Sequence, residues 1–178
     1  MSLFLITGSA GTGKSQVCCA LKERGYEAYD TDDDGLARWQ HIASGYIYPK
    51  SSVKPEQRTA AFIDEHAWIV PREYFKDLLQ KSEHRHRPLF VCGSLGNEDA
   101  VRDLFRTILA LYVDDDTLRQ RLTTRTTNDW GKQPHELEQT LQHHHIIYEQ
   151  HKHHGDTIID ATQPLDEVVD AILRNVIS

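Results

Sequence analysis

Short apolar runs alternate with longer segments in which apolar residues recur every three or four positions. Four such runs, and one segment that ends in an acidic residue, predict five strands: residues 3–6, 26–30, 89–92, 108–113 and 157–160. The segments between them have the spacing of helices that pack one face on a sheet, as in Val17, Ala20 and Leu21. Strands that alternate with helices predict an α/β fold in which helices cover both faces of a parallel sheet.

Five further helices follow from the same spacing. Their inward faces include Leu78 in the second, Val101 in the third, Leu118 in the fourth, Leu141 in a long polar helix over residues 134–151, and Ile172 in the last. Asn97 and the acidic run 114–116 are expected to begin the third and fourth helices, because Asn and Asp favour helix N-termini. We find no internal repeat, and we expect one domain over residues 1–178.

A glycine-rich turn joins the first strand to the first helix. Residues 8–15 fit the phosphate-binding pattern G-x-x-x-x-G-K-[ST] at every fixed position. Backbone N–H groups of such a turn surround phosphate oxygens at the positive end of a helix, where Lys14 reaches the β and γ phosphates and Ser15 ligates Mg²⁺. We therefore expect a nucleoside triphosphate, ATP, to be bound by Gly8, Ser9, Ala10, Gly11, Thr12, Gly13, Lys14 and Ser15.

Composition narrows the class of protein. The content of 39% hydrophobic and 26% charged residues is ordinary for a globular protein, and no apolar run is long enough to cross a membrane. The formal charge of −7 makes nucleic acid an unlikely main partner. Two of the three cysteines, Cys18 and Cys19, are adjacent, which makes a poor disulfide framework and favours a cytoplasmic location. A monomer or a homodimer is expected.

Four predicted strand ends should meet at one site. The P-loop, residues 30–32, 93–94 and 160–162 all follow strands, and ligands of parallel sheets bind at the carboxyl ends of the strands. The run from Asp32 to Gly35 imitates the D-x-x-G sequence of GTPases, but it follows the P-loop too closely and no N-K-x-D sequence occurs. We therefore do not expect a GTPase.

The remaining pattern resembles the superfamily of nucleoside monophosphate kinases and shikimate kinases. The resemblance rests on the P-loop, the D-x-D sequence of residues 30–32, residues 113–125 and residues 160–164. The chain also resembles a group of small bacterial proteins known only as AAA-family ATPases. We accordingly expect a three-layer α/β/α P-loop NTPase fold, with five parallel strands in the order 2-3-1-4-5 when they are numbered along the chain.

The resemblance also implies roles on the donor side. Arg121 would lie against the adenine, Arg125 would reach the phosphates, and Thr162 and Pro164 would belong to the adenine-binding loop. The alternative is that Arg121 and Arg125 are solvated arginines that balance the acidic residues 114–116, since exposed ion pairs are common.

The acidic residues of the D-x-D sequence are the candidates for metal and base. Resemblance to shikimate-type kinases assigns Asp30 to Mg²⁺ and Asp32 to the acceptor hydroxyl as catalytic base, beside Lys14 and Arg125, although which of the two acids is the base stays open. The third strand ends without a carboxylate that could hold the metal. The alternative is an acidic turn that caps a helix containing Leu36 and Trp39.

The acceptor site should draw on residues 35–75, an irregular segment, and residues 126–133 would form a short lid. Gly93 fits a close approach of the acceptor to the backbone, or a plain turn. Histidines gather in the long helix, but the adjacent residues 143–145 point in different directions, so adventitious metal binding is favoured over a functional site. Candidate acceptor ligands are Arg38, Trp39, Tyr46, Arg58 and Arg72.

Two functions from different classes remain. The first is an ATP- and Mg²⁺-dependent kinase that phosphorylates a small molecule such as a nucleoside, a nucleotide or a hydroxylated metabolite, with an antibiotic- or sugar-modifying phosphotransferase as a close relative of that hypothesis. The D-x-D sequence favours a hydroxyl acceptor, because a phosphate acceptor is already ionised and needs no base. The second is a switch or assembly factor that hydrolyses ATP slowly and acts through a partner.

Overall fold

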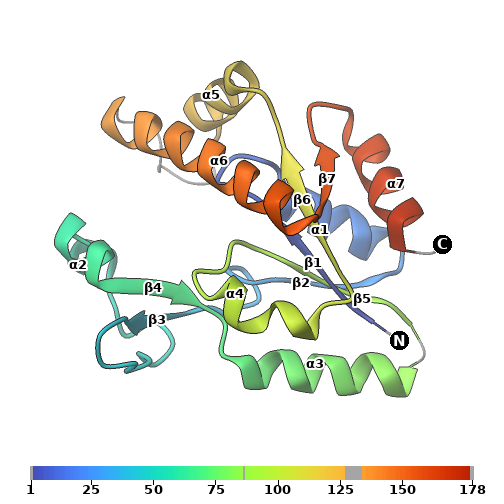
Figure 1. Ribbon diagram of the computed structural model, residues 1–178, viewed down its shortest axis with the longest axis horizontal. Coiled ribbons are helices and arrows are strands. Elements are labelled where there is room, and N and C mark those ends of the chain that lie inside the picture. Colours follow the sequence, from blue (N-terminus) through green and yellow to red (C-terminus); the bar gives the residue numbers. More distant parts are fainter. Residues whose placement is uncertain (1, 86, 127–133, 177–178) are drawn as a thin grey trace.

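A five-stranded parallel sheet forms the centre of the molecule (Figure 1). The computed structural model describes residues 2–85, 87–126 and 134–176. From edge to edge the strands are β2 (Glu27–Asp30), β5 (Leu89–Cys92), β1 (Leu3–Thr7), β6 (Thr107–Tyr112) and β7 (Thr157–Asp160). Numbered along the chain, these strands have the order 2-3-1-4-5, so the predicted topology is confirmed.

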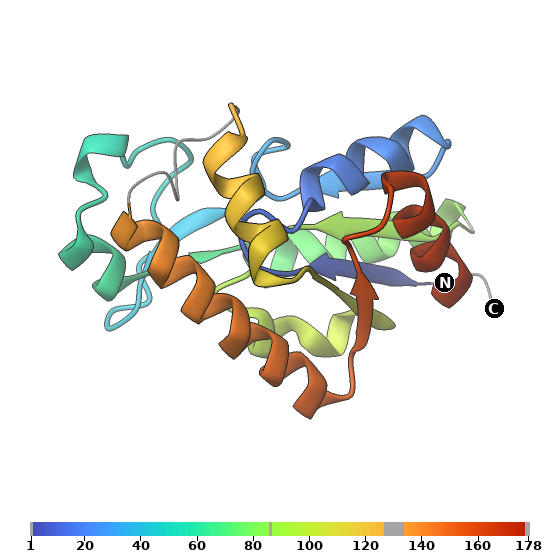
Figure 2. The ribbon, with the colours of Figure 1, turned by 90° about the horizontal axis from the view of Figure 1, so that it is seen from above.

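Helices cover both faces of this sheet. The helices that surround this sheet are α1 (Lys14–Glu23), α3 (Arg72–Arg85), α4 (Glu98–Val101) with the 3₁₀ turn η2 (Arg102–Leu104), α5 (Asp115–Thr124), α6 (Pro134–His154) and α7 (Leu165–Val176). Figure 2 shows α1 and α7 on one side of the strands and α4 on the other. The predicted three-layer α/β/α arrangement is confirmed, and α6 extends three residues beyond its predicted end.

Alternation along each strand divides the core into two parts, since successive side chains point to opposite faces. Phe4, Ile6 and Leu109 join the side chains of α1, α5 and α7 in one hydrophobic cluster. Leu3 and Leu5 join those of α3, α4 and η2 in the other. Among the described residues, no helix combines the length and apolarity that crossing a membrane requires.

Two helix beginnings differ in how they are held. The Asp114 carboxylate accepts the backbone N–H of Thr117, so the predicted cap of α5 is present. Asn97 precedes α4 but its side chain does not cap that helix. Its amide instead accepts the N–H of Val70 and donates to the carbonyl of Val70, which fastens the end of a neighbouring strand to this loop.

A second, smaller sheet was not predicted. Within residues 35–75, β3 (Arg38–His41) pairs antiparallel with β4 (His66–Ile69), and α2 (Ala60–Glu65) and the 3₁₀ turn η1 (Pro55–Gln57) lie between them in sequence. Trp39 thus belongs to a strand, so the alternative of a helix containing Leu36 and Trp39 is wrong. The acidic turn ends at Gly35, whose φ of 65° favours glycine, and Trp39 then pairs with Trp68 across the two strands.

Candidate active site

The P-loop is tightly enclosed by its neighbours. Gly8, Gly11 and Gly13 have φ of 138°, 89° and 101°, a region that side chains strongly disfavour. A Cβ at Gly8 would lie 2.6 Å from the carbonyl oxygen of Leu111, and one at Gly11 would lie 2.8 Å from Cδ1 of Leu118. The end of β6 and α5 therefore leave room only for glycine at positions 8 and 11, whether or not a phosphate is bound.

Ser9 is the residue on which the contacts of the loop converge. Its carbonyl oxygen accepts hydrogen bonds from the Thr12 hydroxyl at 2.9 Å and from the Lys14 ammonium at 2.8 Å. Its hydroxyl lies 2.7 Å from Nδ1 of His144, which comes from the middle of α6. Ser15 is exposed at the first turn of α1. The structure thus places the side chains of Lys14 and Ser15 at the positive end of that helix.

The electrostatics of Lys14 show which charged residues surround it. Burial lowers the pKa of Lys14 to about 8, because an ammonium loses hydration there. The negative charges of Asp32 and Asp30 oppose this shift, and the positive charge of Arg125 adds to it. Asp30, Asp32 and Arg125 therefore lie within electrostatic reach of Lys14, although the four residues come from three separate segments of the chain.

The two acids of the D-x-D sequence have different surroundings. Asp30 is buried, and its Oδ1 accepts the backbone N–H of Asp32 at 2.9 Å and of Asp33 at 3.1 Å. Asp34 accepts the N–H of Asp30 and pairs with Lys22 at 3.0 Å. Asp30 and Asp34 thus hold the turn together, although a strand and not a helix follows it, while Asp32 is exposed to solvent.

Trp68 is the functional candidate that the sequence did not indicate. Its indole N–H donates to Oδ1 of Asp32 at 2.7 Å. Its backbone is held by the N–H of Gly96, 2.7 Å from the Trp68 carbonyl oxygen, and its ring lies 5.0 Å from that of Trp39. No motif marks Trp68, because its contact with Asp32 depends on the pairing of β3 with β4.

The loop after β5 touches both the P-loop and the acidic turn. The Ser94 hydroxyl donates to the carbonyl oxygen of Gly8 at 2.6 Å. A Cβ at Gly93 would collide with the side chain of Thr31. Thr31 therefore fills the space on the Cβ side of Gly93, which explains the glycine by packing, and the approach of an acceptor to its backbone stays a prediction.

Arg121 bridges two predicted parts of the nucleotide site. From α5 it donates to the carbonyl oxygens of Thr12 at 3.3 Å and of Ala161 at 2.8 Å. The alternative of a solvated arginine therefore does not hold for Arg121. Beyond Ala161, Asp160 accepts the N–H and hydroxyl of Thr162, which shapes the turn before Pro164. Contacts of Thr162 and Pro164 with a nucleotide stay a prediction.

The candidate acceptor ligands are only partly available. Arg72 forms an ion pair with Asp103 and also donates to the carbonyl of Ala100, so its guanidinium is held against η2. Arg38 donates to the carbonyl oxygens of Gly35 and Ala37 at 2.7 Å each. Arg58 donates to the carbonyl of Val53, and Tyr46 is exposed. Residues 127–133 of the predicted lid lie outside the described residues.

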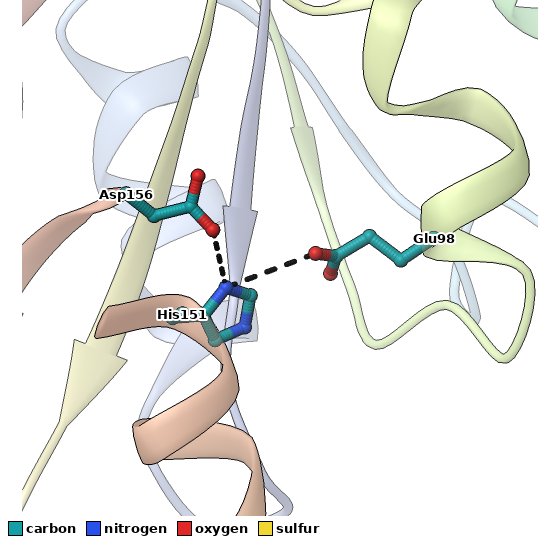
Figure 3. Close-up of side chains that lie close together, drawn as sticks. All are labelled: Glu98, His151 and Asp156. Atoms are coloured by element: carbon teal, nitrogen blue, oxygen red, sulfur yellow. Dashed lines mark hydrogen bonds and ion pairs between the residues drawn. The ribbon is translucent and has the colours of Figure 1, made fainter. Parts of the chain in front are cut away.

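The histidines of α6 reach separate partners. His145 pairs with Asp115, whereas His151 lies 2.7 Å from Asp156 and 3.7 Å from Glu98 (Figure 3). Within the described part of the chain, Glu98, His151 and Asp156 alone bring three possible metal ligands together. Arg102, however, forms ion pairs of 2.6 Å with both carboxylates. It supplies the positive charge that a metal would bring, and we interpret the cluster as a structural ion network.

Comparison with known proteins identifies similar sequences and folds. A family model described as an AAA domain matches residues 5–142, whereas no curated protein matches the chain. The shikimate kinase of Acinetobacter baumannii, solved with shikimate, is 19% identical with a TM-score of 0.59, covering 99% of this chain and 93% of that one. A gluconokinase from Sinorhizobium meliloti 1021 is 19% identical with a TM-score of 0.53, covering 95% and 87%.

A nucleoside kinase has a similar fold. The deoxyadenosine kinase of M. mycoides, solved with bound dATP, is 15% identical with a TM-score of 0.51, covering 99% of this chain and 100% of that one. At such identities these structures show the fold alone. The chain therefore has a P-loop fold that is found in small-molecule kinases.

Proposed function

The chain belongs to the AAA domain family, and from this membership, its P-loop and its fold we propose that it is an ATP-dependent kinase for a small molecule that carries a hydroxyl group. One observation carries the proposal beyond nucleotide binding. The exposed carboxylate of Asp32 lies within electrostatic reach of Lys14. This proximity supports Asp32 as the base, because phosphoryl transfer to a hydroxyl requires a proton acceptor near the transferring phosphate that Lys14 would hold.

On the donor side, the chain neutralises charge and positions the triphosphate. Lys14 would leave the Ser9 carbonyl for the β and γ phosphates, and Arg125 would add a second positive charge. Arg121, with Thr162 and Pro164, would bind the adenine. Mg²⁺ would be held by Ser15, which is exposed beside the P-loop, and by Asp30, and it would supply positive charge against the phosphate oxygens.

On the acceptor side, Asp32 would act as the base. The acceptor oxygen forms a bond to the γ-phosphorus, the bond from that phosphorus to the bridging oxygen breaks, and ADP leaves. The hydroxyl proton goes to the Asp32 carboxylate. Because Trp68 already occupies Oδ1 of Asp32, Oδ2 is the oxygen that we assign to this proton. The half-buried rings of Trp39 and Trp68 suit an acceptor with a flat apolar face, such as a sugar or a nucleoside.

The test is ATP consumption measured over a panel of nucleosides, nucleoside monophosphates, sugars and shikimate. We expect at least one compound to raise ADP formation in the presence of Mg²⁺ and to be recovered as a phosphate ester. Asp32→Asn should abolish this transfer while preserving ATP binding. Slow hydrolysis that no compound changes would contradict the kinase.

Slow ATP hydrolysis that no compound changes would support the alternative function, an ATP-dependent switch or assembly factor. One observation favours this alternative: β5 ends in Cys92-Gly93-Ser94, without the carboxylate that holds Mg²⁺ in many P-loop enzymes. All three cysteines of the chain are free, and Cys18 and Cys92 are buried. Because free cysteines are typical of a reducing compartment, we propose a cytoplasmic location for the protein whichever of the two functions holds.

A further inference from the structure

One buried histidine connects α6 to the P-loop. The inward face of α6 carries Leu137, Leu141 and then His144, whose side chain is 2% exposed. A polar ring in this position would normally be replaced by an apolar residue unless its nitrogens have partners. Both nitrogens of His144 do have partners, and its ring stacks on Tyr112 with centroids 4.8 Å apart and planes 9° from parallel.

The partners determine the tautomer of His144. Nε2 lies 2.8 Å from the carbonyl oxygen of Val113, which can only accept, so Nε2 carries the proton. In the neutral ring Nδ1 is therefore an acceptor, and the Ser9 hydroxyl donates a hydrogen bond to it at 2.7 Å. Burial lowers the pKa of His144, with smaller lowering effects from His145 and Lys14, while the Val113 carbonyl and Asp115 oppose them. These effects favour the neutral ring.

Ser9 itself is 2% exposed, and both its hydroxyl and its carbonyl oxygen form hydrogen bonds. Its carbonyl accepts Thr12 and Lys14, so the place of Ser9 determines where the Lys14 ammonium lies before a nucleotide arrives. When Lys14 moves to a phosphate, that carbonyl loses one of its donors. The bond from the Ser9 hydroxyl to His144 is independent of Lys14 and remains.

We infer that His144 is a positioning residue for the P-loop: it anchors Ser9 through the hydroxyl and so maintains the loop in its phosphate-binding shape while Lys14 changes partners. The inference deepens the proposed function, on which it rests for the identity of the ligand. It gives α6 a direct role in nucleotide affinity, although His144 itself does not touch the nucleotide.

The experiment compares three substitutions by calorimetric titration with Mg·ATP. His144→Ala should weaken the affinity about tenfold, the size expected for one buried hydrogen bond. His144→Asn places an oxygen where Nδ1 was and should recover most of the affinity, whereas His144→Gln preserves only the donor to Val113 and should not. His145→Ala, which alters an exposed neighbour on α6, serves as the matched control. Equal affinities for the Asn and Gln variants would overturn the inference.

A double-mutant cycle guards against a merely structural effect. Ser9→Ala and His144→Ala should each weaken ATP binding, and the double variant should be no weaker than either alone. Additive losses would contradict the proposed link. If the wild-type protein does not bind ATP, the proposed function fails, and the link is then tested by ¹⁵N NMR of the imidazole. The Nδ1 resonance of His144 should shift in Ser9→Ala and stay unchanged in Thr12→Ser; no shift in Ser9→Ala would refute the bond.

Discussion

The donor and acceptor regions of the molecule are built in different ways. The donor region, residues 8–15, is shaped by glycines with positive φ and by hydrogen bonds that side chains donate to backbone carbonyl oxygens. Across β3, α2 and β4 they are rings: Trp39 lies on Trp68, and Phe62 stacks on His66 with centroids 3.7 Å apart. None of the residues of α2 is buried. A site made from backbone geometry tolerates little change, whereas one made from side-chain packing can change its ligand by substitution.

The loop after β5 is where the two regions meet. Ser94 bonds to Gly8 of the P-loop, and Gly96 bonds to Trp68 of the small sheet. The distance between a bound phosphate and the candidate base therefore depends on a short stretch of backbone. Substitutions in the two regions and at this junction should have distinct effects on activity and on stability.

Among the substitutions that compare the two regions, the largest effect is expected at the centre of the donor region. Lys14→Ala should lower kcat/KM for phosphoryl transfer by about 10²–10³, the range for losing one preorganised group that stabilises transition-state charge. The melting temperature should not fall, because burial already disfavours the charged form of this lysine. Transfer assays and thermal unfolding of the same preparation measure both quantities. A stability loss in proportion to the activity loss would show that Lys14 supports the fold instead.

The junction should respond in stability first. Gly93→Ala would direct a methyl group into Thr31, and overpacking of this kind costs about 2 kcal/mol of unfolding free energy. Urea denaturation measures the loss. The double variant Gly93→Ala with Thr31→Gly should regain part of it, since Cβ of Thr31, which would lie 2.7 Å from the new methyl group, is then absent together with the rest of the side chain. If the double variant is as unstable as Gly93→Ala alone, the collision with Thr31 is not the cause.

The same division explains which features the sequence could predict. The five strands and the P-loop were predictable because apolar periodicity and a spaced glycine motif are local signals, whereas the order of the strands was expected only from the resemblance to the kinase superfamily. The pairing of β3 with β4 was not predictable, because the strands are only four residues long, both mix polar with apolar residues, and 24 residues separate them. Trp68 and His144 were missed for a related reason: each acts through one contact distant in sequence.

The acceptor region offers a matched pair of substitutions. Trp68→Phe removes the N–H that Asp32 accepts but preserves an aromatic ring, and it should lower kcat about tenfold with little change in the acceptor KM. Trp39→Phe removes the corresponding N–H, whose nitrogen is buried and has no hydrogen-bond partner among the described residues, so kcat should stay near the wild-type value. Steady-state kinetics with the acceptor found in the panel distinguish the two. Equal losses of kcat would mean that both tryptophans act only through packing.

The smallest expected effect is proton uptake on ATP binding, which should depend on Lys14 in the donor region and not on the acceptor region. Because the pKa of Lys14 is about 8 in the free protein, about half of the Lys14 side chains are neutral amines at pH 8. A bound triphosphate favours the ammonium, so binding should take up about half a proton, and affinity should fall as the pH rises through 8. Titration calorimetry at pH 8 in two buffers of different ionisation enthalpy measures the uptake. Lys14→Arg, which retains a charge that does not titrate there, should abolish it, and Trp68→Phe should preserve it because the acceptor-side indole has no proton to exchange in this range. If Lys14→Arg still takes up protons on binding ATP, the titrating group is another residue. Proton uptake would then no longer distinguish the donor region from the acceptor region.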